Sequence, residues 1–391
     1  MDGKRAAVLV AGGAGYVGSH AVLALLDAGH SVVVLDNLST GNRWAVDTRA
    51  AFFEGGIENE SLVRTIMELH NIQSVMQFAG SYRTAADARD PLKFYRNNTT
   101  ATESLIESAV ACRVKHFVYS GTAETYRLPA PMPVAESWAQ GPNSAYAASM
   151  LVTEQILIDV AAVHPLNFGV LRYFNAAGAD PLKRCGAAQP GAAHMIHQAI
   201  ETVLGQRDHV ELCPAGEATP DGSQVRDYVH VSDLATAHVA LLDGLIAEPA
   251  RNRTYNCGYG EGWSDLAVLD AAERVTNVRI ARRERTTPDG EPPVLVADTG
   301  AIRRELGWQP FYDNLDSLVR DTYRWQMHLP RMRVAHGEGG LHGAGGRPVY
   351  FVNESAGART RASDAPIRAS EAHVLVQSGA AGTSRSVTGK P

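Results

Sequence analysis

The sequence predicts an α/β fold, a doubly wound parallel sheet followed by a smaller C-terminal lobe. Over residues 6–175, short apolar, β-branched runs alternate with longer helical runs. A glycine-rich turn separates the first strand from the first helix, and the alternation loosens after residue 175. A repeated strand, crossover helix and strand place parallel strands side by side in one sheet.

The expected strands are short, apolar and bounded by turn residues, which is typical of strands buried on both faces. They are predicted over residues 8–10, 31–36, 74–80, 116–121 and 168–175. The helices between them are expected over residues 19–28, 61–70, 99–111 and 146–163. Two further helices are expected over about 194–204 and 231–245, within the looser region.

This pattern divides the chain into three segments. Residues 1–175 form the sheet domain, with some later segments returning to it, and residues 176–330 form the second lobe. Residues 331–391 are rich in Gly, Ala, Ser and Arg and show no sustained periodicity, so a largely disordered tail is expected there. Only residues 348–352 in this tail have strand character.

Composition excludes several classes of function. The chain has 391 residues, 36 Lys and Arg against 42 Asp and Glu, and a net charge of −6, which argues against a general binder of nucleic acid or anionic membranes. No uninterrupted apolar run reaches the ~18 residues of a membrane span, and no signal-peptide segment precedes the first strand. The four cysteines form no CxxC pair, so a reduced cytoplasmic protein is expected.

The glycine-rich turn predicts a dinucleotide site. Gly12, Gly15 and Gly18 lie between the first strand and the first helix. Glycine is required there for a tight turn and for close approach of the backbone to a pyrophosphate, which the helix N-terminus attracts. Asp36 closes the second strand, where a carboxylate accepts hydrogen bonds from the adenosine ribose and repels a 2′-phosphate. The sequence therefore predicts NAD rather than NADP. The presence of Asp36 also argues against the alternative that the glycine-rich turn binds no ligand.

The glycine spacing GxxGxxG, with Tyr146 opening a helix, resembles the extended short-chain dehydrogenase/reductase family, the NAD-dependent epimerases and dehydratases with a Rossmann-like fold. Within that family the chain is most similar to the UDP-glucose 4-epimerases. The stretches that carry the resemblance are GGAGYVGSH (12–20), VVLDNLSTGNR (33–43), LRYFNAAGADP (171–181), TPDGSQVRDYVHVSDLATAH (219–238) and RRELGWQP (303–310).

The resemblance implies a reaction and a departure from it. In the family, NAD⁺ takes a hydride from C4 of a nucleotide sugar while a tyrosinate removes the hydroxyl proton. A Ser or Thr assists, and the Lys of Tyr-x-x-x-Lys holds the nicotinamide ribose and lowers the tyrosine pKa. These positions hold Thr122, Tyr146 and Met150. A tyrosine near its ordinary pKa of ~10 is only ~0.1% ionised at pH 7, a deficit of roughly 4 kcal/mol, so ordinary epimerase turnover should be weakened.

The resemblance also assigns contacts and partners. It implies a UDP-linked sugar as substrate, a homodimer through helices 99–111 and 146–163, no nucleic acid and no membrane. The expected cofactor contacts are Gly12, Gly15, Tyr16, Val17, Gly18, Asp36, Asn37, Ile57, Phe78, Ala79, Gly80, Asn97, Tyr146 and Tyr173, and the expected substrate contacts are Thr122, Tyr146, Asn175 and Arg226.

No metal site is expected. The histidines His194 and His197 are three apart on a helix, which indicates a polar face rather than a metal site, and His230 is expected to be structural.

Glu124 leaves a second reaction open. In nucleotide-sugar 4,6-dehydratases and UDP-glucuronate decarboxylases a Glu also follows the catalytic Thr by two positions, and in the dehydratases it removes the C5 proton. Ala123 stands where their acid partner would be. A nucleotide-sugar dehydratase with 4,6- or 5,6-elimination is thus the alternative. A catalytically impaired relative that only binds NAD or a nucleotide sugar is a further one.

Overall fold

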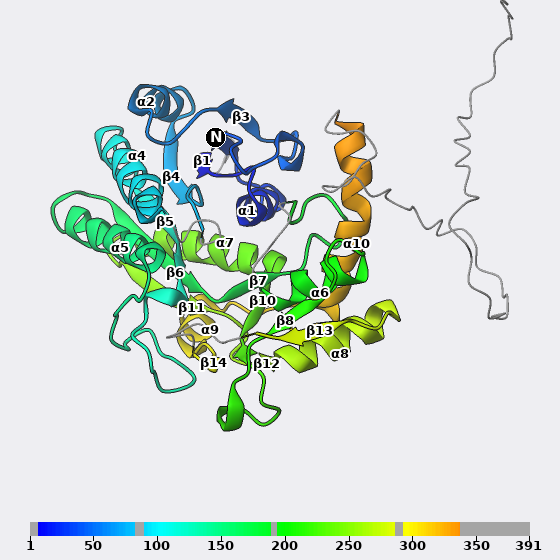
Figure 1. The fold of residues 1–391 in the computed structure, drawn as a ribbon. Helices are drawn as coiled ribbons and strands as arrows, with labels where there is room; N and C mark the ends of the chain where they lie inside the picture. Colours follow the sequence, from blue (N-terminus) through cyan, green and yellow to red (C-terminus); the bar gives the residue numbers. More distant parts are fainter. Residues whose placement is uncertain (1–6, 83–89, 189–193, 286–291, 337–391) are drawn as a thin grey trace, which may run out of the picture. The chain divides into compact units, whose positions relative to one another are not determined.

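A computed structural model describes residues 7–82, 90–188, 194–285 and 292–336 (Figure 1). Seven strands form one parallel sheet in the order β11-β6-β5-β4-β1-β2-β3. They are β1 (Ala7–Ala11), β2 (Val32–Asp36), β3 (Ala51–Glu54), β4 (Ile72–Gln77), β5 (His116–Thr122), β6 (Asn167–Tyr173) and β11 (Arg253–Cys257). The strand order reverses between β1 and β4, and ligands bind at the carboxyl ends of strands at such a point.

Helices cover both faces of this sheet (Figure 1). One face packs against α2 (Glu60–Leu69), α4 (Ala101–Ala111) and α5 (Ala145–Val163), and the other against α1 (Tyr16–Asp27) and α7 (Val231–Ala247). Along β1, Val8 and Val10 pack toward α1 and α7, whereas Leu9 packs toward the opposite helices. Because both faces are covered, the central strands β1 and β2 are almost entirely apolar. The predicted doubly wound α/β class is confirmed.

The helix expected over residues 99–111 begins earlier than predicted. Asp90 caps the short helix α3 (Pro91–Phe94) by accepting a hydrogen bond from the backbone N–H of Lys93. A π-helix, η3 (Tyr95–Thr100), then leads directly into α4. The start at residue 99 was therefore wrong. Asp-Pro is an N-terminal helix signal, with Asp as cap and Pro in the first turn.

In the described part of the second lobe, short strands alternate with the helices α6, α8, α9 and α10. A pair joins β7 (Asn175–Ala177) to β10 (Tyr228–His230), a three-stranded sheet has the order β12-β9-β14, and a further pair joins β13 to β8. The other elements are α6 (Met195–Val203), β8 (Val210–Leu212), β9 (Val225–Arg226), β12 (Trp263–Ser264), α8 (Asp265–Thr276), β13 (Arg282–Glu284), β14 (Val294–Leu295), α9 (Gly300–Leu306) and α10 (Leu315–Ala335), with short 3₁₀ turns η1 (Arg43–Ala45), η4 (Ala123–Thr125) and η5 (Gly216–Ala218). The predicted boundary at residue 330 thus lies inside α10, and residues 348–352 lie outside the described residues.

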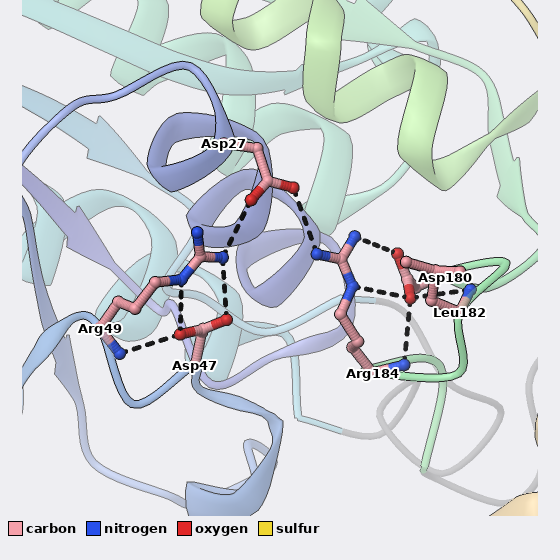
Figure 2. A network of polar contacts seen from close by, with 6 residues as sticks. All are labelled: Asp27, Asp47, Arg49, Asp180, Leu182 and Arg184. Carbon is pink, nitrogen blue, oxygen red and sulfur yellow. Dashed lines mark hydrogen bonds and ion pairs between the residues drawn. The ribbon is translucent and has the colours of Figure 1, made fainter.

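A network of ion pairs fixes the loop that leads from β7 to α6 (Figure 2). Asp27, at the end of α1, accepts hydrogen bonds from Arg49 at 2.9 Å and from Arg184 at 3.2 Å. Arg184 also bonds to Asp180 at 2.6 Å, and Arg49 bonds to Asp47. The loop that carries Asp180 and Arg184 is therefore held against α1.

One helix of the described chain, α5, is long and apolar enough by length and composition to cross a membrane. Its Glu154 is buried and forms an ion pair with Arg172 of β6 at 2.5 Å. Arg172 also donates to the Tyr126 hydroxyl, which donates to Asn256. These contacts hold one face of α5 against the sheet.

Buried histidines lie between α1 and α6. The ring nitrogens of His194 and His197 are 2.9 Å apart, and Tyr16 packs edge-on against both His197 and His20. Burial lowers the pKa of His20 and of His197 to about 4. The helical pair is thus a buried contact, and no three potential metal ligands gather among the residues described.

We expect stability to fall below pH 6.5 because of these histidines. An unfolded histidine takes up its proton near pH 6.5, whereas folded His20 and His197 accept it only near pH 4. Folding therefore becomes less favourable as pH falls from 6.5 toward 4, by up to about 3 kcal/mol for each group. His197→Leu should flatten the dependence of the unfolding temperature on pH, and the exposed-site control His164→Asn should not. An unchanged slope in His197→Leu would contradict this origin.

Candidate active site

The glycine turn is shaped by close backbone contacts. Gly12 has a φ of +78°, and a Cβ there would lie 2.5 Å from the backbone nitrogen of Ala79. A Cβ on Gly18 would lie 2.1 Å from the carbonyl oxygen of Gly12. Gly15 is the N-cap residue of α1 and forms no side-chain cap. The N-terminal N–H groups of this 12-residue helix are thus available to a phosphate.

Asp36 joins this turn to the end of β2. Its Oδ2 accepts a hydrogen bond from the backbone N–H of Ala14 at 2.9 Å, and its Oδ1 accepts one from Leu38 at 2.8 Å. Burial raises the pKa of Asp36, although these hydrogen bonds oppose the shift. Each carboxylate oxygen has a second acceptor site, which suits the hydroxyls of a ribose. Together with the close approaches at Gly12 and Gly18, this geometry fits NAD.

Asp36→Asn is expected to weaken NAD binding about tenfold and to reduce the preference for NAD over NADP. The amide accepts weaker hydrogen bonds and no longer repels a 2′-phosphate. Calorimetric titration with both cofactors measures the change. Asp47→Asn, which alters a carboxylate paired with Arg49, is the matched control. An unchanged ratio of the two affinities would show that Asp36 does not face the ribose.

Gln77 fixes the turn after β4, where Phe78, Ala79 and Gly80 lie. Its Oε1 accepts from the backbone N–H of Ala79, and its Nε2 donates to the carbonyl of Ala79, both at 2.9 Å. Phe78 packs against the His238 ring at 4.8 Å. The backbone of Ala79 is therefore held against Gly12. Sequence reasoning missed Gln77, because its role becomes visible only when β4 ends beside the glycine turn.

Asn98, rather than Asn97, is the buried asparagine of this region. Asn98 accepts from the backbone N–H of Ser81 at 2.7 Å and donates to its carbonyl at 2.9 Å. A Cβ on Gly80 would lie 2.8 Å from Asn98 Oδ1. The side chain of Asn97 is exposed and donates to Ser81 Oγ at 2.8 Å. Both lie on the π-helix η3, so helical spacing alone could not tell which of them faces the site.

The catalytic candidates come together at the carboxyl end of β5. Thr122 ends β5, and its Oγ1 accepts from the backbone N–H of Glu124 at 3.2 Å. Tyr146 lies in the first turn of α5, which Ser144 caps, and packs edge-on against Phe94 at 5.7 Å. Thr122 and the half-buried Glu124 both lie close enough to Tyr146 to affect the pKa of its hydroxyl.

Among the residues that the structure describes, no cation is one of the groups that act most strongly on Tyr146. Burial raises its pKa well above 10, the neighbours Tyr173, Glu124 and Tyr119 raise it further, and only the hydrogen bond with Thr122 lowers it. Its pKa therefore lies above the ordinary value assumed from the sequence. One helical turn on, the sulfur of Met150 accepts a hydrogen bond from the Tyr119 hydroxyl at 3.2 Å. Residue 150, where the family has a lysine, is thus an uncharged methionine that contacts Tyr119.

The other predicted cofactor residues lie at the ends of the same elements. Tyr16 and Val17 begin α1, with the Tyr16 hydroxyl bonded to the carbonyl of Gly178 at 2.7 Å. The hydroxyl of Tyr173, at the end of β6, lies 2.7 Å from Ser120 Oγ. Asn37 is exposed after β2, and Ile57 is buried after β3.

Two of the four predicted substrate residues, Asn175 and Arg226, lie in the second lobe. Asn175 begins β7, and its backbone N–H donates to the carbonyl of Asp227 at 3.1 Å. Arg226, in β9, donates to Gln224 Oε1 and to the carbonyl of Val225, both at 2.9 Å. These contacts orient the half-buried guanidinium, whose donor geometry suits phosphate oxygens.

Comparisons with known proteins agree with this arrangement. Residues 8–258 match the model of the NAD dependent epimerase/dehydratase family. The chain is 41% identical to a UDP-glucose 4-epimerase of Azospirillum brasilense over 82% of this chain and 92% of that protein. It is 37% identical to one of Lacticaseibacillus casei over 83% of this chain and 97% of that protein.

Solved structures give the same result. The UDP-glucose 4-epimerase of Stenotrophomonas maltophila, with bound NAD and formylated UDP-arabinopyranose, has a TM-score of 0.80 at 33% identity, over 84% of this chain and 99% of that one. The UDP-Glc/GlcNAc 4-epimerase of Campylobacter jejuni has a TM-score of 0.74 at 34% identity, over 82% and 99%. The chain belongs to the NAD dependent epimerase/dehydratase family.

Proposed function

We propose that the protein is an NAD-dependent isomerase of UDP-sugars, similar to UDP-glucose 4-epimerase, which acts through transient oxidation at C4. The observation that carries this proposal is the Thr122–Tyr146 pair beside a glycine turn and Asp36, in a chain 41% identical to a UDP-glucose 4-epimerase. When bound, NAD⁺ accepts the hydride from C4 of the sugar, and the reduced cofactor returns the hydride to C4.

The residues of the chain divide the remaining work. Asp36 and the N-terminus of α1 hold the adenosine ribose and the pyrophosphate of the cofactor. Tyr146, beside Thr122, takes the proton from the C4 hydroxyl and returns it. Arg226 pairs with the diphosphate of the substrate, and Asn175 contributes to the same wall. Because position 150 carries methionine and no ammonium among the described residues acts on Tyr146, turnover is slow at neutral pH and rises with pH.

Incubation with NAD and each of four substrates, UDP-glucose, UDP-galactose and their N-acetyl forms, tests this function. We expect NMR to show interconversion of at least one pair at C4. If calorimetry shows bound NAD and none of the four sugars changes, the epimerase function is wrong. The chain is then a binding relative.

A second candidate function is elimination of water from the sugar, with Glu124 as base. The half-buried carboxylate of Glu124 acts on Tyr146, so it lies beside the reacting end of the site. The buried Ala123 offers no acid partner, which favours epimerisation. Loss of one water from the sugar in the wild type, abolished in Glu124→Gln, would establish elimination. Unchanged activity in that variant would remove Glu124 from the mechanism.

We also infer a cytoplasmic homodimer that associates through α4 and α5. All four cysteines are free thiols, as expected of a reduced compartment. Val152, Ile158 and Val163 of α5 are 42, 49 and 76% exposed, and covering such apolar side chains stabilises association. Ile158→Glu should convert the dimer to a monomer in light scattering, whereas Leu182→Glu, at an exposed apolar residue elsewhere, should not. A monomeric wild type would exclude this assembly.

A further inference from the structure

A buried hydroxyl in the site is bound to a weak acceptor. Tyr119 of β5 is 3% exposed, and its hydroxyl donates to the sulfur of Met150 at 3.2 Å. A thioether sulfur accepts hydrogen bonds weakly, so this contact returns little of what burial of the hydroxyl costs. Phenylalanine would fill the same space without a buried donor.

The Tyr119 hydroxyl lies against the part of α5 that carries the chemistry. Tyr146 and Met150 are one helical turn apart on the same face, and Glu154 follows one turn later. Tyr119 is among the groups whose charge acts on Tyr146, and its own pKa is affected by its neighbours Thr153, Glu154 and Tyr173. Tyr119 lies in the middle of β5 beneath α5, Tyr146 lies in the first turn of α5, and Tyr173 ends the neighbouring strand β6.

The buried cation that packs on this face is already committed. Arg172 pairs with Glu154 through both Nε and Nη2 and also bonds to the hydroxyl of Tyr126. It therefore neutralises Glu154 rather than serving position 150. Tyr119 is the donor that the structure places directly on the side chain of residue 150.

We propose that Tyr119 is the hydrogen-bond donor to the nicotinamide ribose, in place of the lysine missing at position 150. Its hydroxyl leaves the Met150 sulfur when the cofactor binds, because a sugar oxygen is a stronger acceptor than a thioether. This inference rests on the proposed NAD-dependent function. It separates the two roles of the family's lysine, since a neutral hydroxyl can hold the ribose but supplies no positive charge. The account explains how cofactor binding is retained while the ionisation of Tyr146 is not assisted.

A double-mutant cycle over residues 119 and 150 tests the proposal. Calorimetric titration with NAD alone is carried out on the wild type, Tyr119→Phe, Met150→Lys and the double variant. We expect Tyr119→Phe to weaken NAD binding about tenfold in the wild type and about twofold or less in the Met150→Lys background, where the introduced ammonium supplies the donor. Equal losses in both backgrounds, or no loss in either, would overturn the proposal. Tyr255→Phe is the matched control, because it removes a tyrosine hydroxyl on β11 that is hydrogen-bonded to Glu305.

Two further measurements keep the result interpretable. Thermal unfolding shows whether each variant is folded, and Met150→Leu removes the sulfur while leaving Tyr119 in place. If Met150→Leu binds NAD as tightly as the wild type or more tightly, the sulfur only accepts the Tyr119 hydrogen bond while no cofactor is bound. A clear loss of affinity would mean that Met150 itself contacts the cofactor. Because no sugar is present, these titrations are independent of the epimerase assay. Failure of one does not imply failure of the other.

Discussion

Tyr146→Phe is expected to lower turnover about 10³-fold while leaving the fold and NAD binding intact. In the proposed mechanism the phenolate of Tyr146 takes the proton from the C4 hydroxyl, and its neighbour Thr122 cannot replace it, because an alkyl hydroxyl is a far weaker acid. The ring keeps its contact with Phe94, so the unfolding temperature should not change. Conversion of the UDP-sugar, followed by NMR, gives the rate.

Tyr95→Phe is the matched control for this variant, because Tyr95 lies 38% exposed on the π-helix η3. It should retain wild-type turnover. A Tyr146→Phe variant that keeps turnover within about tenfold of the wild type would assign the proton transfer to another group, and Glu124 would then be the first to replace.

Met150→Lys is expected to raise turnover at pH 7 about 10- to 100-fold. Burial holds the pKa of Tyr146 well above 10 and the Glu124 charge raises it further, whereas an ammonium one helical turn away favours the tyrosinate. The sign follows directly, since the ionised form is the base. Wild-type turnover should rise with pH up to the limit of protein stability, and the lysine variant should reach its plateau at lower pH.

Met150→Leu controls for volume in this experiment, because leucine fills similar space without charge. It should bring no gain in turnover. If Met150→Lys also brings no gain while NAD and the UDP-sugar still bind, the loss of lysine is not what limits the enzyme. The substrate lobe would then be the place to look.

Sequence reasoning reached the parts of the fold that rest on local pattern. The five predicted strands are all buried on both faces, so their continuous apolar runs were sufficient evidence. The two sheet edges were missed. Strand β11 (Arg253–Cys257) mixes Arg, Thr and Asn with apolar residues, and its Arg253 pairs with Glu248. Its pairing with β6 depends on contacts from about 80 residues away in sequence, which no local pattern contains.

The site was predictable where one backbone feature determines the residue. Gly12 and Gly18 must lack a side chain, and Asp36 ends its strand beside them. The contacts of Asn98 and of Tyr119 could not be predicted, because each depends on how a neighbouring element is placed. Asn98 faces the turn after β4 only through the π-helix, and Tyr119 reaches Met150 only because β5 packs under α5. The altered pKa of Tyr146 is likewise a property of packing.

A UDP-sugar deuterated at C4 tests the central claim, that this lysine-free site breaks the C4–H bond. With NAD and the wild-type protein, the labelled sugar should react more slowly than the unlabelled one, and the epimerised product should carry the deuterium at C4. Both effects should disappear in Tyr146→Phe. If both sugars are converted at equal rates and the product has lost the deuterium from C4 to solvent, the account is contradicted. If the deuterium is recovered at C6, the reaction is an elimination and not an epimerisation.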